Sequence, residues 1–309
     1  MKKNIIYLIL ILFSTFLNAN EKIVLQLKWF HQFQFAGYYA AKEKGFYDEV
    51  GLNVEIRQRD LKYNNIDEVI NGNAQYGVAD SILILYRLKQ QPVVIVSPIF
   101  QHSPSVFISL KKSNISSVYE LNNKDILFYP NDTDGFSLLA MIKKFDLDVN
   151  LVRERYKDDY MRLINNEVDV MPAYIANEPF LFKEKGYDVN IINPTNYGFD
   201  MYGDMLFTNE DEAKNNPIRV EKFKEATLKG WKYALENKEE ITQLINEKYS
   251  KEKSIEHLRY EANAIDSLIN KDVTPLGYLD QGRIRYISEM YEYYGLTESK
   301  IDLNDFLFY

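Results

Sequence analysis

The sequence of 309 residues contains no cysteine and only three histidines, His31, His102 and His257. The lack of cysteine excludes disulfide bonds, thiolate metal sites, a cysteine nucleophile and lipid attachment at a cysteine. The three histidines lie far apart in the sequence and lack the spacing of metal ligands. We therefore expect no metal site and no cofactor.

Motifs of common catalytic sites are also absent. The sequence has no G-x-S-x-G motif, no phosphate-binding loop and no dinucleotide fingerprint. Its formal net charge is −8, and it becomes two charges more negative without Lys2 and Lys3. An acidic chain repels phosphate backbones and anionic lipids, so neither DNA nor any other nucleic acid is an expected partner.

Long apolar runs are missing except at the N-terminus. Two lysines precede the apolar residues 5–17, and Leu17, Asn18 and Ala19 form a small-residue exit. This pattern predicts a secretory signal peptide at 1–19, because the apolar run is short for a membrane span. We expect cleavage and a periplasmic protein, with an uncleaved anchor as the alternative.

Hydrophobic periodicity beyond residue 20 predicts alternating strands and helices. The apolar run 93–96 is typical of a strand that is buried on both faces of a parallel sheet. The expected strands are 22–28, 52–56, 76–79, 93–96, 106–110, 126–129, 149–153 and 168–174. The expected helices are 36–44, 67–71, 82–90, 117–121, 135–144, 158–165, 177–185, 217–236, 239–249, 255–269 and 280–294.

The strand–helix alternation restarts near residue 105 and gives way to helices after Asn209. This order predicts an α/β protein of two doubly wound lobes joined by crossovers near Leu110 and 201–207. Residues 20–109 and 207–309 would form the first lobe and 110–206 the second. Ligands of such sheets bind at the carboxyl ends of strands, which would face each other across a cleft.

Six aromatic residues and a histidine follow the first expected strand, between Trp29 and Tyr39. Three of the rings, Phe33, Phe35 and Tyr39, are expected to pack the first helix onto its sheet. An indole or a phenol presents a flat face together with one polar group, which suits ligand stacking. Trp29, Gln34 and Tyr38 are therefore candidate ligand contacts, with core packing as the alternative.

Polar residues follow two further strands of the first lobe. Asp80 and Ser81 open a helix, so Ser81 is expected to be its N-cap, while the same helix start offers N–H groups to an anionic ligand group. Gln101 and Ser103 follow the apolar strand near the first crossover and are candidate ligand contacts. His102 between them is either a contact or a hydrogen-bonded structural residue.

The second lobe offers its candidates at two places. Tyr174, Asn177 and Glu178 follow an expected strand, with Asn177 as the helix cap and Glu178 placed where the helix dipole favours an acid. Tyr202 and Asp204 lie on the returning segment between glycines, which allow close approach of the backbone. One acid there would hold a protonated amine or the edge of an aminopyrimidine.

Several segments together resemble the thiamine pyrimidine synthase-like family of periplasmic binding proteins, which includes sulfonate-binding members. The segments are KWFHQFQFAGYYAA from Lys28, IFQHSPS from Ile99, NEPF from Asn177, YGFDMYGD from Tyr197, GWKYAL from Gly230 and LGYLDQGRIRYI from Leu276. The resemblance spans nearly all of the chain after the signal segment. It implies a type II periplasmic binding-protein fold, with two α/β lobes, a two-stranded crossover and closure around a small ligand.

Similar proteins serve ABC importers for pyrimidine precursors of thiamine or for sulfonates, and others are sensor parts of membrane kinases or cyclases. The resemblance therefore implies a small planar ligand and, as protein partner, an ABC permease or a membrane sensor. An enzyme that makes the thiamine pyrimidine also belongs to the family and needs a lysine, a histidine and a cysteine-rich iron motif. Residues 77–84 contain neither lysine nor histidine, and cysteine is absent, so we expect a binding protein, not an enzyme.

Overall fold

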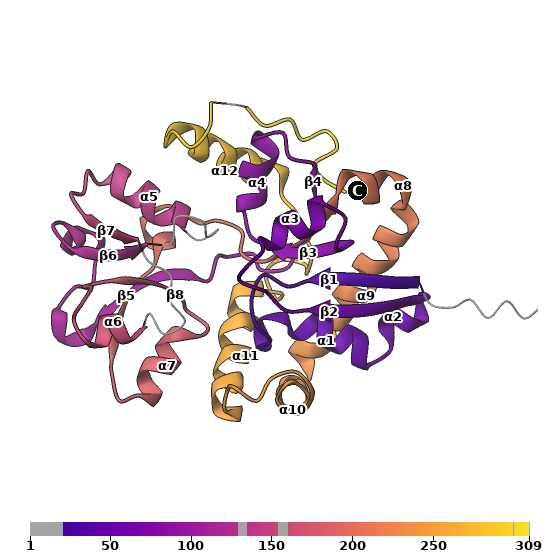
Figure 1. The fold of residues 1–309 in the computed structure, drawn as a ribbon, viewed down its shortest axis with the longest axis horizontal. Helices are drawn as coiled ribbons and strands as arrows, with labels where there is room; N and C mark the ends of the chain where they lie inside the picture. The colour runs from indigo at the N-terminus through magenta and orange to yellow at the C-terminus, as the bar shows by residue number, and fades with distance from the viewer. Residues whose placement is uncertain (1–20, 129–134, 154–159, 299, 309) are drawn as a thin grey trace, which may run out of the picture.

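The computed structural model describes residues 21–128, 135–153, 160–298 and 300–308. The predicted signal segment 1–19 lies outside these residues. Figure 1 shows two α/β lobes beside each other, the first built around β1 to β4 and the second around β5 to β8. This architecture confirms the two-lobed α/β fold that strand–helix alternation predicts.

The first lobe contains a five-stranded sheet of order β2-β1-β3-β10-β4. Strand β1 runs parallel to β2 and β3, whereas β10 runs antiparallel to both β3 and β4. Buried Leu52, Val54 and Ile56 alternate with more exposed neighbours in β2, which is the period of a strand with one covered face. The strands are β1 Glu21–Gln26, β2 Leu52–Arg57, β3 Tyr76–Ala79, β4 Val93–Pro98 and β10 Met205–Asn209.

Helices cover both faces of this sheet. The longest, α9, buries residues three or four positions apart, including Phe223, Thr227 and Trp231, and packs this stripe against α1. Helix α12 packs against α4 on the side nearer the second lobe (Figure 1). The helices are α1 Ala36–Glu43, α2 Phe46–Glu49, α3 Asn65–Ile70, α4 Ile82–Leu88, α8 Glu210–Asn215, α9 Pro217–Glu236, α10 Lys238–Lys248, α11 Ile255–Ile269 and α12 Gln281–Tyr293.

The second lobe has a three-stranded antiparallel sheet of order β8-β5-β9 and a parallel pair, β6-β7. A bridge between Ile126 and Val170 connects the pair to the chain entering β8. Its elements are β5 Ser105–Leu110, β6 Asp125–Phe128, α5 Gly135–Lys144, β7 Asn150–Arg153, α6 Tyr160–Ile164, β8 Met171–Tyr174, α7 Glu178–Glu184 and β9 Val189–Ile192. Short 3-10 turns are η1 Phe33–Phe35, η2 Lys111–Ser113, η3 Val118–Leu121 and η4 Pro194–Tyr197.

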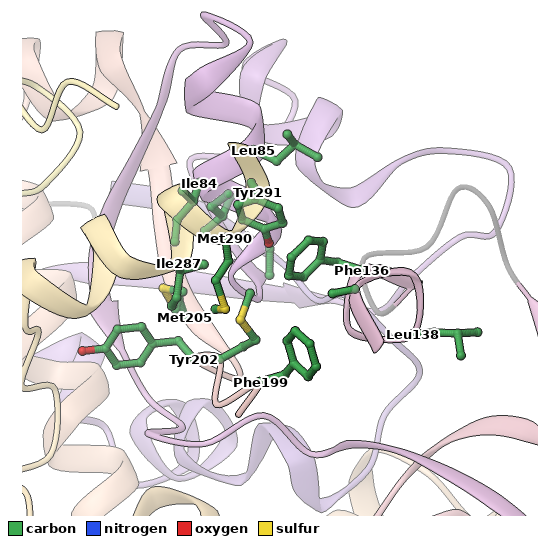
Figure 2. Packing of buried hydrophobic residues seen from close by; sticks show 14 of the residues in the cluster. Ile84, Leu85, Phe136, Leu138, Phe199, Tyr202, Met205, Ile287, Met290 and Tyr291 are labelled. Atoms are coloured by element: carbon green, nitrogen blue, oxygen red, sulfur yellow. The ribbon is translucent and has the colours of Figure 1, made fainter. Parts of the chain in front are cut away.

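One hydrophobic cluster joins the two lobes. It packs α4 and α12 of the first lobe against α5 of the second, and Figure 2 shows Phe136 facing Tyr291 within it. The ring centroids of Phe136 and Tyr291 are 4.2 Å apart. Tyr202, which precedes β10, belongs to the same cluster. The lobes are therefore fixed to each other on the α12 side.

Four local predictions need correction. Strand β4 is buried on both faces, but it pairs antiparallel with β10 because the chain returns to the first lobe there. Strand β9, Val189–Ile192, was not predicted, because it is only four residues long, Asn190 interrupts its apolar run and only Ile192 is buried. Ser81 donates to the carbonyl of Tyr202 (3.0 Å) instead of capping α4, and Asp80 accepts from the Ile82 N–H. The fourth correction, at Asn177, is described with the site.

The division of the chain into lobes at 20–109, 110–206 and 207–309 remains a proposal, and the position of the first crossover changes. The whole of β5 pairs with β8 and β9 in the second lobe. The first crossover therefore precedes Ser105 instead of lying at Leu110. The expected strand end at Tyr129 and the expected helix start at Asp158 lie outside the described residues.

Candidate ligand-binding site

Three charged residues lie at one edge of the first-lobe sheet. Lys28 follows the end of β1 by two residues, Asp80 directly follows β3, and Asp204 directly precedes β10. Because β10 is antiparallel, its start lies beside the end of β3, and Met205 pairs with Ala79. The strand order thus places one lysine and two carboxylates together.

The ammonium of Lys28 binds both carboxylates and a group from the other lobe. Its Nζ atom lies 2.9 Å from Asp80 Oδ2 and 3.4 Å from Asp204 Oδ1. It also donates to the hydroxyl of Tyr174, the last residue of β8, at 2.5 Å. All three charged side chains are buried. Lys28 therefore connects the two lobes at the carboxyl ends of their strands.

Asp204 has an unusual environment for an acid. Gln34 donates to Asp204 Oδ2 at 2.8 Å, whereas Oδ1 accepts no hydrogen bond from the described residues. Burial raises the pKa of Asp204 to about 6, and Asp80 adds to the rise while Lys28 and Gln34 oppose it. The carboxylate therefore takes up a proton only slightly below neutral pH.

A second lysine connects the lobes nearby. Lys253, in the loop before α11, donates to Asn177 Oδ1 of the second lobe at 2.7 Å and to Gln32 Oε1. It also pairs with Glu261, whose other oxygen accepts the backbone N–H of Phe33 at 2.8 Å. Gln32 in turn donates to Gln34. Both lysines thus belong to one hydrogen-bonded network.

The side chain of Glu178, the first residue of α7, accepts two hydrogen bonds at the start of that helix. Glu178 accepts the backbone N–H of Tyr174 and the side-chain amide of Asn177, both at 2.6 Å. Asn177 consequently makes no side-chain cap to α7, which corrects the capping prediction. Burial raises the pKa of Glu178, and the Tyr174 N–H and Lys253 act against that rise. Tyr260 also donates to the carbonyl of Ile175 across the lobes at 3.0 Å.

We refer to this set of residues as the inter-lobe polar cluster. It comprises Lys28, Gln32, Gln34, Asp80, Tyr174, Asn177, Glu178, Asp204, Lys253 and Glu261. Six of its members are predicted ligand contacts: Gln34, Asp80, Tyr174, Asn177, Glu178 and Asp204. The structure places these six together, and their contact with a ligand remains a prediction.

Two predicted aromatic contacts lie around the cluster. Trp29 is half-buried and packs edge-on against Phe30, with centroids 5.3 Å apart. Tyr38 is buried, and its ring packs edge-on against Trp231 at 5.8 Å. A Cβ atom at the preceding Gly37 would lie 2.1 Å from Trp231, so only glycine allows this approach of α1 to α9.

The other predicted contacts bind neighbouring chain segments. Gln101 donates to the carbonyl of Tyr278 at 3.0 Å, and Ser103 accepts the N–H of Ser105. Tyr202 accepts the N–H of Asp280 at 3.0 Å and lies under the guanidinium of Arg283. Gln101 and Tyr202 thus hold the crossover segments to the chain at the start of α12. Ser103 bonds within its own turn, Ser81 bonds to Tyr202, and all four residues lie outside the polar cluster.

Four members of the cluster were not predicted from the sequence: Lys28, Gln32, Lys253 and Glu261. Lys28 and Gln32 flank Trp29 in the aromatic stretch, so the argument from strand ends applied to them equally. Lys253 and Glu261 carry no local signal, since they lie in a charged loop and on a long helix. Only the packing of α11 beside η1 and α7 brings them to the site.

Comparison with known proteins identifies the family. Residues 32–241 match the profile of a family described as NMT1/THI5 like. The chain belongs to the NMT1/THI5-like family. This membership agrees with the family resemblance of the aromatic segment that begins at Lys28 and of the other segments quoted in the sequence analysis.

Relatives of this NMT1/THI5-like protein include two named binding proteins. The riboflavin-binding protein RibY of Chloroflexus aurantiacus is 26% identical over 236 residues, which are 72% of this chain and 65% of RibY. The match thus spans less than two thirds of the length of RibY. The formylaminopyrimidine-binding protein of Halalkalibacterium halodurans is 23% identical over 232 residues, 74% of this chain and 70% of that protein.

Solved structures with the same fold include sulfonate-binding proteins. The periplasmic aliphatic sulphonate binding protein SsuA of Escherichia coli has a TM-score of 0.70 at 13% identity, over 93% of this chain and 97% of that one. The alkanesulfonate-binding protein SsuA of Xanthomonas axonopodis pv. citri, bound to MOPS, has a TM-score of 0.71 at 11% identity with the same coverage. At such identities the likeness shows the fold, which is that of periplasmic binding proteins.

These four relatives and structural neighbours are binding proteins and not enzymes. Within the described part of the chain, no three His, Asp or Glu side chains form a group that would hold a metal ion. No helix among the described residues has the length and apolar character to cross a membrane.

Proposed function

We propose that this protein is an exported solute-binding protein that closes over a small planar N-heterocycle of the pyrimidine type and delivers it to an ABC permease. The named relatives support a heterocyclic ligand, because one binds a formylaminopyrimidine and another binds riboflavin. The predicted signal peptide at 1–19, cleaved before Asn20, supports delivery to the periplasm.

The observation that carries the proposal is a pair of lysine contacts between the lobes. Lys28, after the end of β1, donates to Tyr174 at the end of β8. Lys253, in the loop before α11, donates to Asn177 at the start of α7. A site at facing strand ends, closed by a few polar contacts, is the arrangement expected of a hinge-closing binding protein.

The side chains suggest how affinity and closure are combined. Trp29 would supply a flat surface for the ligand ring, while Gln34, Asp80 and Asp204 would orient its polar edge. A ligand that contacts both lobes favours the closed state by its difference in affinity for the closed and open states. Tyr174, Asn177 and Glu178 are the second-lobe residues placed to make that difference.

Native mass spectrometry of the protein purified from its own cells tests the proposal directly. We expect a co-purifying heterocycle, and titration calorimetry should then give a dissociation constant near or below about 1 μM, as for an affinity of about 8 kcal/mol. X-ray scattering should show that the same compound makes the protein more compact. The proposal fails if no compound co-purifies and neither formylaminopyrimidine, riboflavin nor thiamine binds.

Export is tested separately. The mass of the intact protein recovered from the periplasm should correspond to a chain that begins at Asn20. A full-length chain found only in the membrane fraction would contradict cleavage and favour the anchored alternative.

A further inference from the structure

The two ends of the boundary between the lobes differ in chemistry. At one end α12 of the first lobe packs against α5, and at the other end α11 packs against α7. Helix α12 lies near the top of Figure 1 and α11 near the bottom. When two lobes move apart about a hinge, the end whose contacts cost less free energy to break is the end that separates.

The contact between α12 and α5 is apolar. Phe136 of α5 is 6% exposed, and its ring centroid lies 4.2 Å from that of Tyr291 and 6.4 Å from that of Tyr294 (Figure 2). Phe199, on the returning crossover segment, lies 5.7 Å from Tyr294. One hydrophobic cluster thus continues from the first lobe into the second. Separation at this end would expose apolar surface to water, at a cost that grows with the exposed area.

The crossover segments are held at the same end. Arg283 of α12 pairs with Asp200 of the returning segment at 3.1 Å. The Nδ1 atom of His102, on the outgoing segment, lies 2.8 Å from Asp200 Oδ1. Tyr286 of α12 donates to the carbonyl of Gly198 at 3.4 Å. The crossover segments and the α12–α5 contact therefore form one continuous connection between the lobes.

The contact between α11 and α7 is more polar. Tyr260 of α11 donates to the carbonyl of Ile175 at 3.0 Å. Phe180 of α7 is only partly buried, and its ring contacts Tyr260 and His257, whose rings carry polar groups. Among the described residues, Ala176 is the only second-lobe member of the hydrophobic cluster that includes α11. The apolar core of the first lobe therefore stops at this end of the boundary.

Two further hydrogen bonds cross the boundary beside α11. Lys253 donates to Asn177 at 2.7 Å, and Ser254, the next residue, donates to Glu184 of α7 at 2.9 Å. The side chain of Glu184 is 39% exposed, so water already competes for it. Because water replaces hydrogen bonds of this kind at a small net cost, the α11–α7 contact separates more readily than the α12–α5 contact.

We propose that the protein opens at one end only: the second lobe turns about the α12–α5 contact and the crossover segments, α7 moves away from α11, and the ligand enters and leaves between α7 and α11. This motion breaks the contact of Lys253 with Asn177 and that of Lys28 with Tyr174. The inter-lobe polar cluster then becomes accessible from the α11 side. The inference rests on the proposed function, which requires that the lobes open, and adds the side on which they do so.

The lack of cysteine allows two pairs of spin labels to be placed without background labelling. Lys183→Cys with Glu256→Cys labels α7 and α11, and Lys143→Cys with Glu292→Cys labels α5 and α12, all at exposed positions. Electron paramagnetic resonance measures both distances in protein freed of ligand by unfolding and refolding. We expect the α7–α11 distance to extend by about 5 Å or more, one helical turn, beyond that in the structure, and the α5–α12 distance to stay unchanged.

Two matched variants locate the end that opens. Tyr260→Phe and Tyr286→Phe each remove a phenol hydroxyl that donates to a backbone carbonyl across the boundary, that of Ile175 and that of Gly198, respectively. Tyr260→Phe should raise the ratio of open to closed molecules about threefold or more, as for the loss of one hydrogen bond. Tyr286→Phe should leave this ratio unchanged. Circular dichroism verifies folding.

The outcomes separate this inference from the proposed function. The inference is wrong if both distances lengthen together, if only the α5–α12 distance lengthens, or if neither lengthens in the ligand-free wild type and in Tyr260→Phe. Riboflavin and formylaminopyrimidine, added separately, test the proposed ligand class, because at least one should return the α7–α11 distance to its closed value. If the ligand-free protein opens beside α11 alone and neither compound closes it, the inference holds and the proposed ligand class is contradicted.

Discussion

The Lys253 ammonium lies 2.7 Å from the Asn177 side-chain oxygen, which joins the loop before α11 to the start of α7 in the other lobe. From this contact, hydrogen bonds and one ion pair, between Asp204 and Lys28, continue through the first lobe and return to the second lobe at Tyr174. The path runs through Asn177, Lys253, Gln32, Gln34, Asp204, Lys28 and Tyr174. The two lysine contacts between the lobes are therefore parts of one network.

Lys253→Met should weaken lobe closure. The substitution removes the contact with Asn177 and leaves the buried carboxylate of Glu261 without its cation. We expect the dissociation constant of the co-purified ligand to rise about tenfold or more, because closure supplies part of the binding free energy. Titration calorimetry measures the affinity, and X-ray scattering should show a larger radius of gyration with ligand present.

Lys238→Met is the control for this prediction. Lys238 also pairs with an acid, Asp266 at 2.6 Å, but the pair lies between α10 and α11 within the first lobe. The affinity of the Lys238→Met variant for the ligand should match that of the wild type. Equal affinities for both variants would show that Lys253 has no part in closure.

Lys28→Met should destabilise the fold as well as the complex. It leaves Asp80 and Asp204 as neighbouring buried acids without their shared cation. Removal of one partner of a buried ion pair typically costs about 3–5 kcal/mol. Urea unfolding should show a loss of about this size in the free energy of unfolding.

Lys22→Met offers the comparison for Lys28. Lys22 pairs with Glu55 at 3.4 Å, and the two side chains are 73% and 46% exposed. Such pairs contribute at most about 1 kcal/mol, so the change in unfolding free energy should be small. A similar loss for both variants would contradict the buried role of Lys28.

The stability of the protein should depend on pH through Asp204. Its pKa is about 6 in the folded chain against 3.8 for an ordinary aspartate. Between these values the folded state binds the proton more tightly, so this contribution is present below about pH 4 and is lost as pH rises through about 6. Glu178 and Glu261 act in the same direction, and His257, with its pKa lowered to about 4, acts in the opposite direction.

Asp204→Asn isolates this contribution, because an amide resembles the protonated acid. The free energy of unfolding of the wild type, minus that of the variant, should fall between pH 4 and pH 7. The fall should be on the order of 2–3 kcal/mol, as expected for a shift of about two pKa units. Urea titrations at several pH values measure it, and a constant difference would show that the pKa of Asp204 is ordinary.

Gly230→Ala should disturb the contact between α1 and α9. A Cβ atom at Gly230 would lie 2.2 Å from the carbonyl oxygen of Gly37 and 2.6 Å from Ala41 Cβ. Overpacking of this kind costs about 1–3 kcal/mol, and here the obstacle is backbone. The melting temperature should fall by several degrees, whereas Gly282→Ala, which meets only the Asp280 side chain at 3.1 Å, should change it little.

Much of the fold follows from local patterns in the sequence. The bounds of α5, α9, α11 and β3 agree with the predictions to the residue, because each has a clear period and a proline, glycine or polar residue at an end. Strand ends also directed attention to Asp80 and Tyr174 before any tertiary contact was known, and the returning segment between glycines directed it to Asp204. The rule that ligands bind at such ends requires only the order of the elements.

Other features depend on tertiary contacts that no local pattern encodes. The direction of β10 beside β4 follows from the return of the chain out of the second lobe. Lys253 reaches the site only because α11 packs beside α7 and η1. Ser81 and Asn177 have the composition of helix caps, yet their side chains bond to Tyr202 and to Glu178 and Lys253 instead. At these two positions, hydrogen bonds to other residues replace the helix caps that the local sequence predicts.

Tyr174 and Asn177 are three residues apart, at the end of β8 and the start of α7, and Glu178 holds both of them. One turn of the backbone therefore carries both Tyr174, which Lys28 contacts, and Asn177, which Lys253 contacts. A small rotation of this turn releases Lys28 and Lys253 together. Because one turn carries both contacts, we expect them to form and break together, so that the protein alternates between two discrete shapes.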